Sequence, residues 1–112
     1  MIAISLKRDE VYERLCQVAQ EAIEQFPEVC EIRLFGSLAR VEETGLSDID
    51  LFLVTERKEE NPIERVRPYF MFFSERVPLA VDLIAVQPQE VEEFAELLSE
   101  SRLLARREAE IG

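Results

Sequence analysis

Three aspartates border or interrupt apolar runs of the sequence, where a buried strand would normally place apolar side chains. Asp48 and Asp50 lie two positions apart around the start of "IDLFLVT", and Asp82 stands inside "LAVDLIAV". Successive side chains of a strand point to opposite faces, so Asp48 and Asp50 should share one face. If the strand that holds Asp82 lies beside the first one, all three carboxylates can converge on one point.

Convergent carboxylates in a chain without histidine indicate a hard divalent cation. Cys16 and Cys30 form no CxxC pair, so a zinc site is not expected and both are interpreted as buried, reduced thiols. Oxygen ligands fit Mg²⁺ or Mn²⁺, and two ions about 4 Å apart could share Asp48 and Asp50. In the plainer alternative, Asp48 caps a turn while Asp50 and Asp82 are simply exposed strand residues.

A Gly-Ser pair, Gly36 and Ser37, directly follows the apolar run "VCEIRLF". Glycine lets a ligand approach the backbone closely, and the first amides of a helix favour a phosphate group. The alternative is a tight turn with a helix cap. Because the pair stands shortly before Asp48, the residues together predict a metal-bound nucleoside triphosphate held between a backbone cradle and the three aspartates.

Hydrophobic periodicity predicts the elements that must position these residues. In chain order we expect a helix over 8–26, a strand over 29–35, a short helical turn over 37–43, a strand over 49–55, a helix over 63–77 that Pro68 kinks or splits, a strand over 79–86 and a final helix from Pro88. The buried stripe of that final helix is expected to contain Val91, Phe94, Leu97, Leu98, Leu103 and Leu104. This order favours one α/β (α+β) domain over 1–112, with helices flanking a small mixed β-sheet.

The aromatic segment "PYFMFFSERV" has more apolar surface than one helix face can bury. Phe70 and Phe73 are expected in the core, whereas Tyr69 and Phe72 are expected at an interface with a partner or a second copy. The segment therefore leaves a homo-oligomer possible.

Composition excludes several classes of protein. The net charge of −11 disfavours binding to DNA or RNA phosphates. No apolar run approaches the ~20 residues that a membrane-spanning helix needs, and the first residues do not resemble a signal peptide. We therefore expect a cytoplasmic protein without a membrane segment.

The stretch "GSLARVEETGLSDID" resembles the G-S-x10-D-x-D signature of the nucleotidyltransferase superfamily related to DNA polymerase β. The short chain and the aspartate in "VDLIAV" are similar to its minimal nucleotidyltransferase (MNT) branch. The resemblance implies a nucleotidyltransferase-like fold and a metal-dependent enzyme that uses ATP. It also implies that Asp48 and Asp50 coordinate the metal ions of the nucleotide, while Asp82 holds the catalytic metal and helps to activate an acceptor hydroxyl.

The resemblance further implies that Gly36 and Ser37 hold the β- and γ-phosphates. Arg40 matches an arginine that is frequent in the family's "GSxAR" stretch; otherwise it is a surface arginine that offsets nearby acidic residues. The chain departs from the pattern at Leu38, where many members have a basic residue, and at Val41, where many have glycine. Both departures concern the nucleotide grip rather than the aspartates.

The MNT branch is typically paired with a HEPN-family toxin protein, on which it acts as an antitoxin by moving AMP from ATP onto a tyrosine. The resemblance therefore implies a protein adenylyltransferase with a HEPN partner. Two alternatives remain: a non-catalytic antitoxin that blocks its partner by binding, and a transferase for a small molecule such as an antibiotic, completed by a second subunit.

Overall fold

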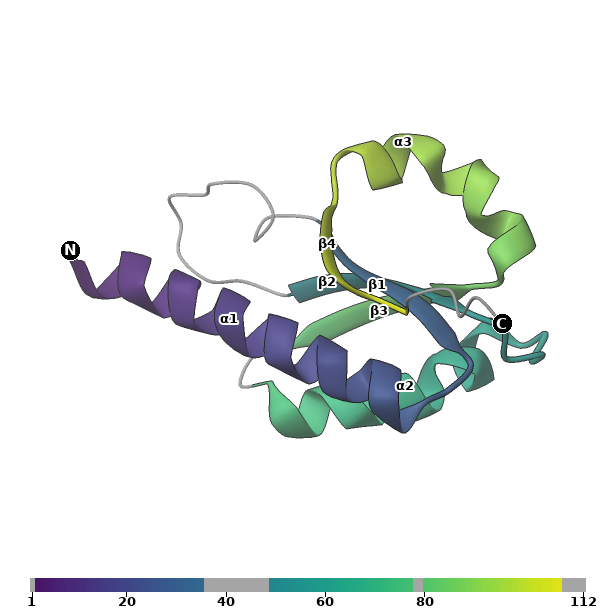
Figure 1. The fold of residues 1–112 in the computed structure, drawn as a ribbon, viewed down its shortest axis with the longest axis horizontal. Helices are drawn as coiled ribbons and strands as arrows, with labels where there is room; N and C mark the ends of the chain where they lie inside the picture. The colour runs from purple at the N-terminus through teal and green to yellow at the C-terminus, as the bar shows by residue number, and fades with distance from the viewer. Residues whose placement is uncertain (1, 36–48, 78–79, 108–112) are drawn as a thin grey trace.

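In the computed structural model, a mixed four-stranded sheet has two long helices on one face and a short helical segment on the other (Figure 1). The structure describes residues 2–35, 49–77 and 80–107. The elements are α1 (Ile2–Gln25), β1 (Val29–Phe35), β2 (Ile49–Thr55), α2 (Pro62–Arg76), β3 (Val81–Val86), the 3-10 helix η1 (Pro88–Phe94), α3 (Ala95–Ser99) and β4 (Arg102–Arg106).

The strand order is β3-β2-β1-β4. Strands β2 and β3 run parallel, and β1 is antiparallel to both of its neighbours, β2 and β4. The expected α+β class and mixed sheet are confirmed, as are the predicted strand ranges 29–35 and 49–55. None of the helices in the described part of the chain is long and apolar enough to cross a membrane.

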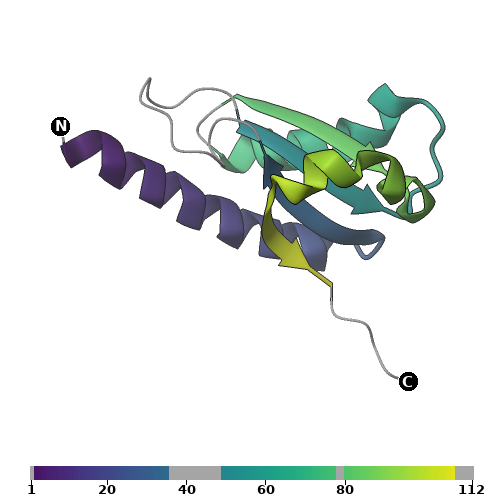
Figure 2. The same ribbon diagram turned by 90° about the horizontal axis from the view of Figure 1, so that it is seen from above.

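The face of the sheet that packs against α1 and α2 contains most of the core. Alternate strand residues such as Leu34, Leu51 and Leu53 are fully buried there, against Leu15 and Val18 of α1. Figure 2 shows α1 running obliquely along the sheet and extending beyond it at its N-terminal end. This alternation fixes which strand residues face the other way.

The opposite face is covered at one end by η1 and α3. Phe52, Val54 and Val86 are buried there beneath Phe94 and Leu97, and the rings of Phe52 and Phe94 meet edge to face at 5.3 Å. Asp50 and Asp82 point to this same face, because their neighbours Ile49 and Val81 are buried on the helix side.

The prediction of a long final helix is wrong. The helical part ends at Ser99, and Leu103 and Leu104 belong to β4. Without β4, β1 would present unpaired backbone groups at the edge of the sheet, and pairing Leu34 with Arg102 and Ile32 with Ala105 satisfies them. Two adjacent leucines fit a helix stripe and a strand equally well, so only the edge of the sheet distinguishes the two structures.

The interpretation of the aromatic segment is also wrong in part. Tyr69 and Phe72 are buried in the core together with Phe73, whereas Phe70 is 43% exposed. The helix turns the 69, 72 and 73 positions to the sheet, and the Tyr69 hydroxyl is held by hydrogen bonds to Thr55 and Glu28, each 2.8 Å. The prediction for Phe73 is therefore confirmed, whereas those for Tyr69, Phe70 and Phe72 are wrong.

Pro68 does not split α2, which is one uninterrupted helix from Pro62 to Arg76. Asn61 caps its first turn by accepting hydrogen bonds from the Ile63 and Glu64 amides. The two cysteines, Cys16 and Cys30, are free as predicted, but they are half-buried rather than buried.

Candidate functional site

Two of the three predicted aspartates lie side by side on neighbouring strands. The parallel register of β2 and β3 pairs Asp50 with Asp82, and the antiparallel register of β1 and β2 pairs Phe35 with Asp50. Phe35, Asp50 and Asp82 therefore form a row on the face of the sheet opposite α1 and α2, which we call the aspartate row. Asp50 is half-buried and Asp82 is exposed. Adjacent strands are about 4.8 Å apart, so both carboxylates can reach one small ligand.

The other predicted site residues, Asp48, Gly36, Ser37 and Arg40, lie outside the described residues, as does the expected helical turn over 37–43. Strand β1 ends at Phe35, within the aspartate row, and Gly36 and Ser37 are the next two residues of the chain. The roles predicted for these residues therefore stay predictions.

The donor chemistry of the aspartate row fits Mg²⁺ or Mn²⁺. The two members of the row that can bind a metal, Asp50 and Asp82, carry carboxylates. Carboxylate oxygens are the hard ligands that these ions prefer. Among the described residues, no group of three or more potential metal ligands comes together. A complete site on this row would need the third predicted ligand, Asp48, which precedes Ile49 of β2 in the sequence.

A second row of side chains borders the aspartate row on the same face. The registers place Arg33, Phe52 and Ile84 side by side, two positions further along each strand. Phe52 is buried beneath Phe94, so η1 and α3 begin to cover the sheet at this second row. Arg33 is thus a cation whose strand position borders the aspartate row, and no motif in the sequence marks it.

Arg33 is held from two sides. Its Nε donates to the Glu31 carboxylate, and its Nη1 donates to the Ser101 hydroxyl at 3.3 Å. The Ser101 hydroxyl in turn donates to the Leu98 carbonyl at 2.7 Å, which connects α3 to this network. Arg106 donates to the second oxygen of Glu31 at 3.0 Å. The contacts join β1, β4 and the end of α3 around one guanidinium.

Burial tends to raise the pKa of the Glu31 carboxyl, but the hydrogen bonds from Arg33 and Arg106 outweigh it, so the pKa is lowered below its usual value. Glu31 is therefore ionised over the neutral range and holds both arginines by charge-assisted hydrogen bonds. Nothing in the sequence signals this arrangement beyond the alternation that puts Glu31 and Arg33 on one face of β1.

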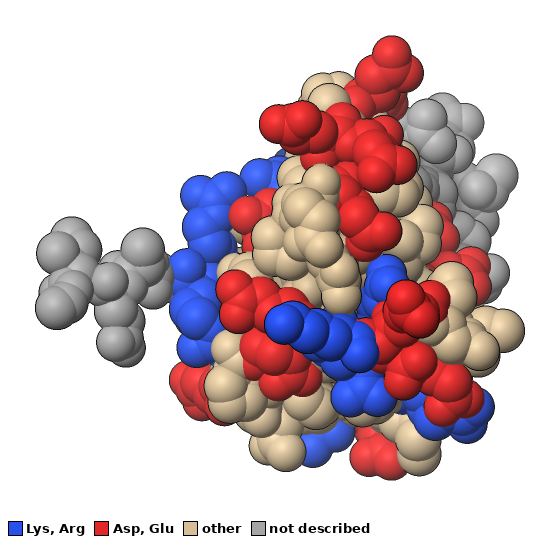
Figure 3. Space-filling model, turned by 90° about the vertical axis from the view of Figure 1, so that its right-hand side faces the viewer, with Lys and Arg blue, Asp and Glu red and all other residues tan. Residues whose placement is uncertain are grey.

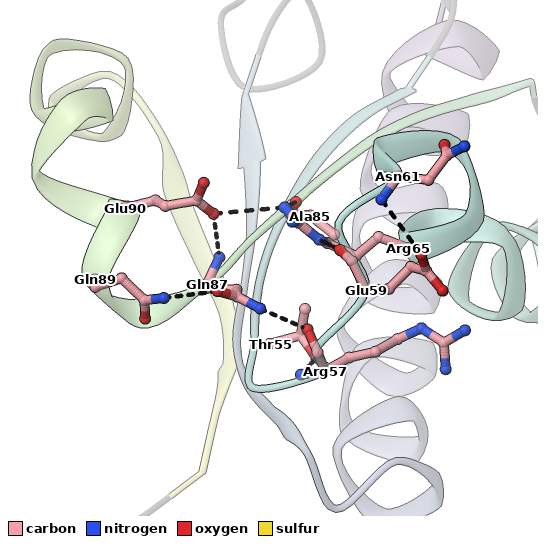
Figure 4. A network of polar contacts seen from close by, with 9 residues as sticks. All are labelled: Thr55, Arg57, Glu59, Asn61, Arg65, Ala85, Gln87, Gln89 and Glu90. Carbon is pink, nitrogen blue, oxygen red and sulfur yellow. Dashed lines mark hydrogen bonds and ion pairs between the residues drawn. The ribbon is translucent and has the colours of Figure 1, made fainter.

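Polar groups at the opposite ends of β2 and β3 pair with one another (Figure 4). Arg65 of α2 donates to the carbonyls of Glu59 at 2.7 Å and Ala85 at 3.1 Å, and contacts the Glu90 carboxylate at 3.4 Å. Gln87 donates to the Arg57 carbonyl at 2.9 Å. These contacts tie the loop after β2 to the start of η1.

We call this end of β2 and β3, near Thr55 and Val86, the paired end. Two shallow cavities of about 400 and 580 Å³ lie there, and both are lined by Lys58, Gln87 and Gln89. Their lining includes acidic side chains next to the lysine. They lie at the other end of β2 from Asp50, so they are not part of the aspartate row.

Comparisons with known proteins concern the family and the fold of the chain. The family model described as "Polymerase beta, Nucleotidyltransferase" matches residues 17–110. The fold is similar to the crystal structure at 1.40 Å of a "putative nucleotidyltransferase" from Sulfolobus solfataricus, with a TM-score of 0.68 and 24% sequence identity over 93% of this chain and 87% of that chain. At this identity the likeness concerns the fold alone. No curated protein matches the chain significantly.

Proposed function

Because the chain belongs to the polymerase beta nucleotidyltransferase family, we propose that it is a metal-dependent enzyme that moves AMP from ATP to a hydroxyl group of a protein partner. The observation that carries the proposal is the register pair of Asp50 and Asp82 on parallel strands. Carboxylate oxygens on adjacent strand positions are the ligands that Mg²⁺ or Mn²⁺ prefers. A metal-bound triphosphate fits such a pair.

In the proposed reaction the acceptor oxygen forms a bond to the α-phosphorus of ATP, and the bond from that phosphorus to pyrophosphate breaks. Asp50 and Asp48 hold the nucleotide's metal, Gly36 and Ser37 hold its β- and γ-phosphates, and Arg40 contributes a positive charge beside them. Asp82 is the more exposed of the two described aspartates, so it faces the acceptor and receives its hydroxyl proton. When bound, Mg²⁺ or Mn²⁺ neutralises the charge that develops on the phosphates.

We propose a HEPN-family toxin protein as the partner, with a tyrosine hydroxyl as the acceptor. The net charge of −11 supports a basic protein as the acceptor, because opposite charges steer association. Figure 3 shows acidic side chains spread over much of one side of the molecule, with basic ones between them.

The test is to incubate the protein with Mg²⁺ and ATP labelled at the α-phosphate, in the presence of a HEPN partner. Transfer of the label to the partner is expected from α-labelled ATP and not from γ-labelled ATP. Asp82→Asn should abolish transfer, and Glu92→Gln, which changes an exposed carboxylate of η1, should retain it.

Transfer by Asp82→Asn at the wild-type rate would refute the proposed role of Asp82. Neutralisation of the partner by wild type and Asp82→Asn alike, with no label transferred, would favour the non-catalytic antitoxin. Label found on an added aminoglycoside instead of the protein would favour the small-molecule transferase.

A further inference from the structure

We propose that Arg33 binds the phosphate chain of the nucleotide, an inference that rests on the proposed function. The charge of the site motivates it. A triphosphate brought against the aspartate row needs positive charge besides the metal, and the protein as a whole has a net charge of −11. Arginine suits this role because its planar guanidinium donates to phosphate oxygens from several nitrogens.

The sheet register puts Arg33 next to the row. Arg33 pairs with Phe52, and Phe35, two positions later in β1, pairs with Asp50. Diagonal neighbours of this kind on one face lie about 7–8 Å apart, within the reach of a long side chain. Among the described strand residues of that face, Arg33 is the cation nearest to Asp50 by register.

One of the two hydrogen bonds of Arg33, from Nη1 to Ser101, reaches towards the end of β1. Ser101, which accepts from Nη1, directly precedes Arg102, and Arg102 pairs with Leu34. The serine therefore lies at the same end of the sheet as Phe35, where the chain continues to Gly36. Nε donates to the Glu31 carboxylate, which lies two residues earlier in β1. Among the described residues the hydrogen bonds of Arg33 use Nε and Nη1, and Nη2 carries two further N–H groups of the kind that donate to phosphate oxygens.

Arg106 provides a matched control. It contacts the same Glu31 carboxylate at 3.0 Å, but its register partner is Glu31, a full two positions further from the aspartate row than Arg33. Its side chain is 54% exposed, against 20% for Arg33. The two arginines therefore share a structural contact and differ in their distance from the proposed nucleotide.

The experiment is calorimetric titration of the full chain with ATP and with tripolyphosphate, each with Mg²⁺, and with adenosine. Arg33→Ala should weaken binding of ATP and tripolyphosphate between about tenfold and a hundredfold, the range expected for a charge-assisted hydrogen bond. Adenosine binding should not change. Arg33→Lys should recover part of the loss, and Arg106→Ala should change each dissociation constant less than about twofold. Ser101→Ala, which keeps the charge but releases Nη1, should weaken ATP binding less than Arg33→Ala.

Equal binding of ATP by wild type and a folded Arg33→Ala would overturn the inference and leave the proposed function intact. An equal loss in Arg33→Ala and Arg106→Ala would also overturn it, because the effect would then be general electrostatics. If wild type binds neither ATP nor tripolyphosphate, the proposed function fails and the inference fails with it. Thermal melting of every variant identifies one that does not fold, and in that case Arg33→Lys and Ser101→Ala decide.

Discussion

Polar groups are arranged differently at the two ends of the parallel strands β2 and β3. At the end near Thr55 and Val86, an arginine, two glutamates and a glutamine exchange hydrogen bonds and close a loop (Figure 4). At the end near Ile49 and Val81, two carboxylates of the same charge lie on adjacent strands. The first end is stabilised by contacts between its own polar groups, whereas the second brings together two carboxylates of the kind that a divalent cation binds. Substitutions at each end test whether the two ends differ in function as they differ in composition.

The largest expected effect concerns the aspartate row. Asp82→Asn should lower nucleotidyl transfer by at least about 1,000-fold, since metal-assisted charge stabilisation is worth several kcal/mol. Because it also removes one of two neighbouring like charges, the free energy of unfolding should stay equal or rise. Transfer kinetics and urea denaturation of the same preparation measure both. A large loss of stability would show that Asp82 has a structural role.

A substitution at the paired end should lower stability and leave nucleotide binding unchanged. Arg65→Ala should lower the free energy of unfolding by about 1.5–3 kcal/mol, because it removes charge-assisted hydrogen bonds from a side chain that is only 11% exposed. ATP binding by the folded protein should not change.

The control is Arg67→Ala, which breaks an ion pair with Glu64 on the same helix where the arginine is 59% exposed. Its cost should be much smaller than that of Arg65→Ala, because solvent screens an exposed ion pair. Urea denaturation compares the two variants, and equal losses would contradict the assignment of this end as structural.

Tyr69 is a core residue beside the paired end, where its hydroxyl forms a hydrogen bond with Thr55. Tyr69→Phe should lower the free energy of unfolding by about 1 kcal/mol at neutral pH, through the lost hydrogen bonds to Thr55 and Glu28. Burial, opposed by the hydrogen bond with Thr55 and assisted by Glu28, raises the pKa of Tyr69 to about 12. The raised pKa means that the contribution of Tyr69 is complete below about pH 10 and is lost as the pH rises towards 12.

Chemical denaturation at pH 9 and pH 11 tests this prediction. Wild type should lose more stability between these values than Tyr69→Phe does. Parallel losses in the two proteins would show that the phenol does not titrate with unfolding.

The sequence predicted what depends on local pattern and missed what depends on pairing. Strands β1 and β2 follow from alternation over seven residues each, and their predicted bounds agree with the structure. The juxtaposition of Asp50 and Asp82 was predicted only on the condition that the two strands are neighbours. Leu103 and Leu104 fit the predicted helix as well as a strand, because two adjacent leucines have no period of their own. No pattern in the sequence marks Arg33, because its neighbours are defined by the register across three strands.

Glu31→Gln should have the smallest effect on the free energy of unfolding. Glu31 joins strands through its contacts with two arginines, and one of them, Arg33, borders the aspartate row. Its pKa is lowered because hydrogen bonds from Arg33 and Arg106 outweigh the effect of burial. A lowered pKa in the folded state means that Glu31 stabilises the fold above its unfolded pKa of about 4.3 and that this contribution is lost as the pH falls below that value. Glu31→Gln should cost less than Tyr69→Phe at pH 7, since the amide oxygen can still accept from Arg33, and Arg106, which is 54% exposed, can turn to water.

The free energy of unfolding should also fall less steeply between pH 5 and pH 3 in Glu31→Gln than in wild type, as urea denaturation at each pH can measure. If Glu31 serves only the fold, ATP binding by Glu31→Gln at pH 7 stays unchanged. If it also orients Arg33 towards a phosphate, ATP binding weakens by less than in Arg33→Ala and adenosine binding does not change. The same variant thus distinguishes an ion pair that holds strands together from one that prepares a binding site.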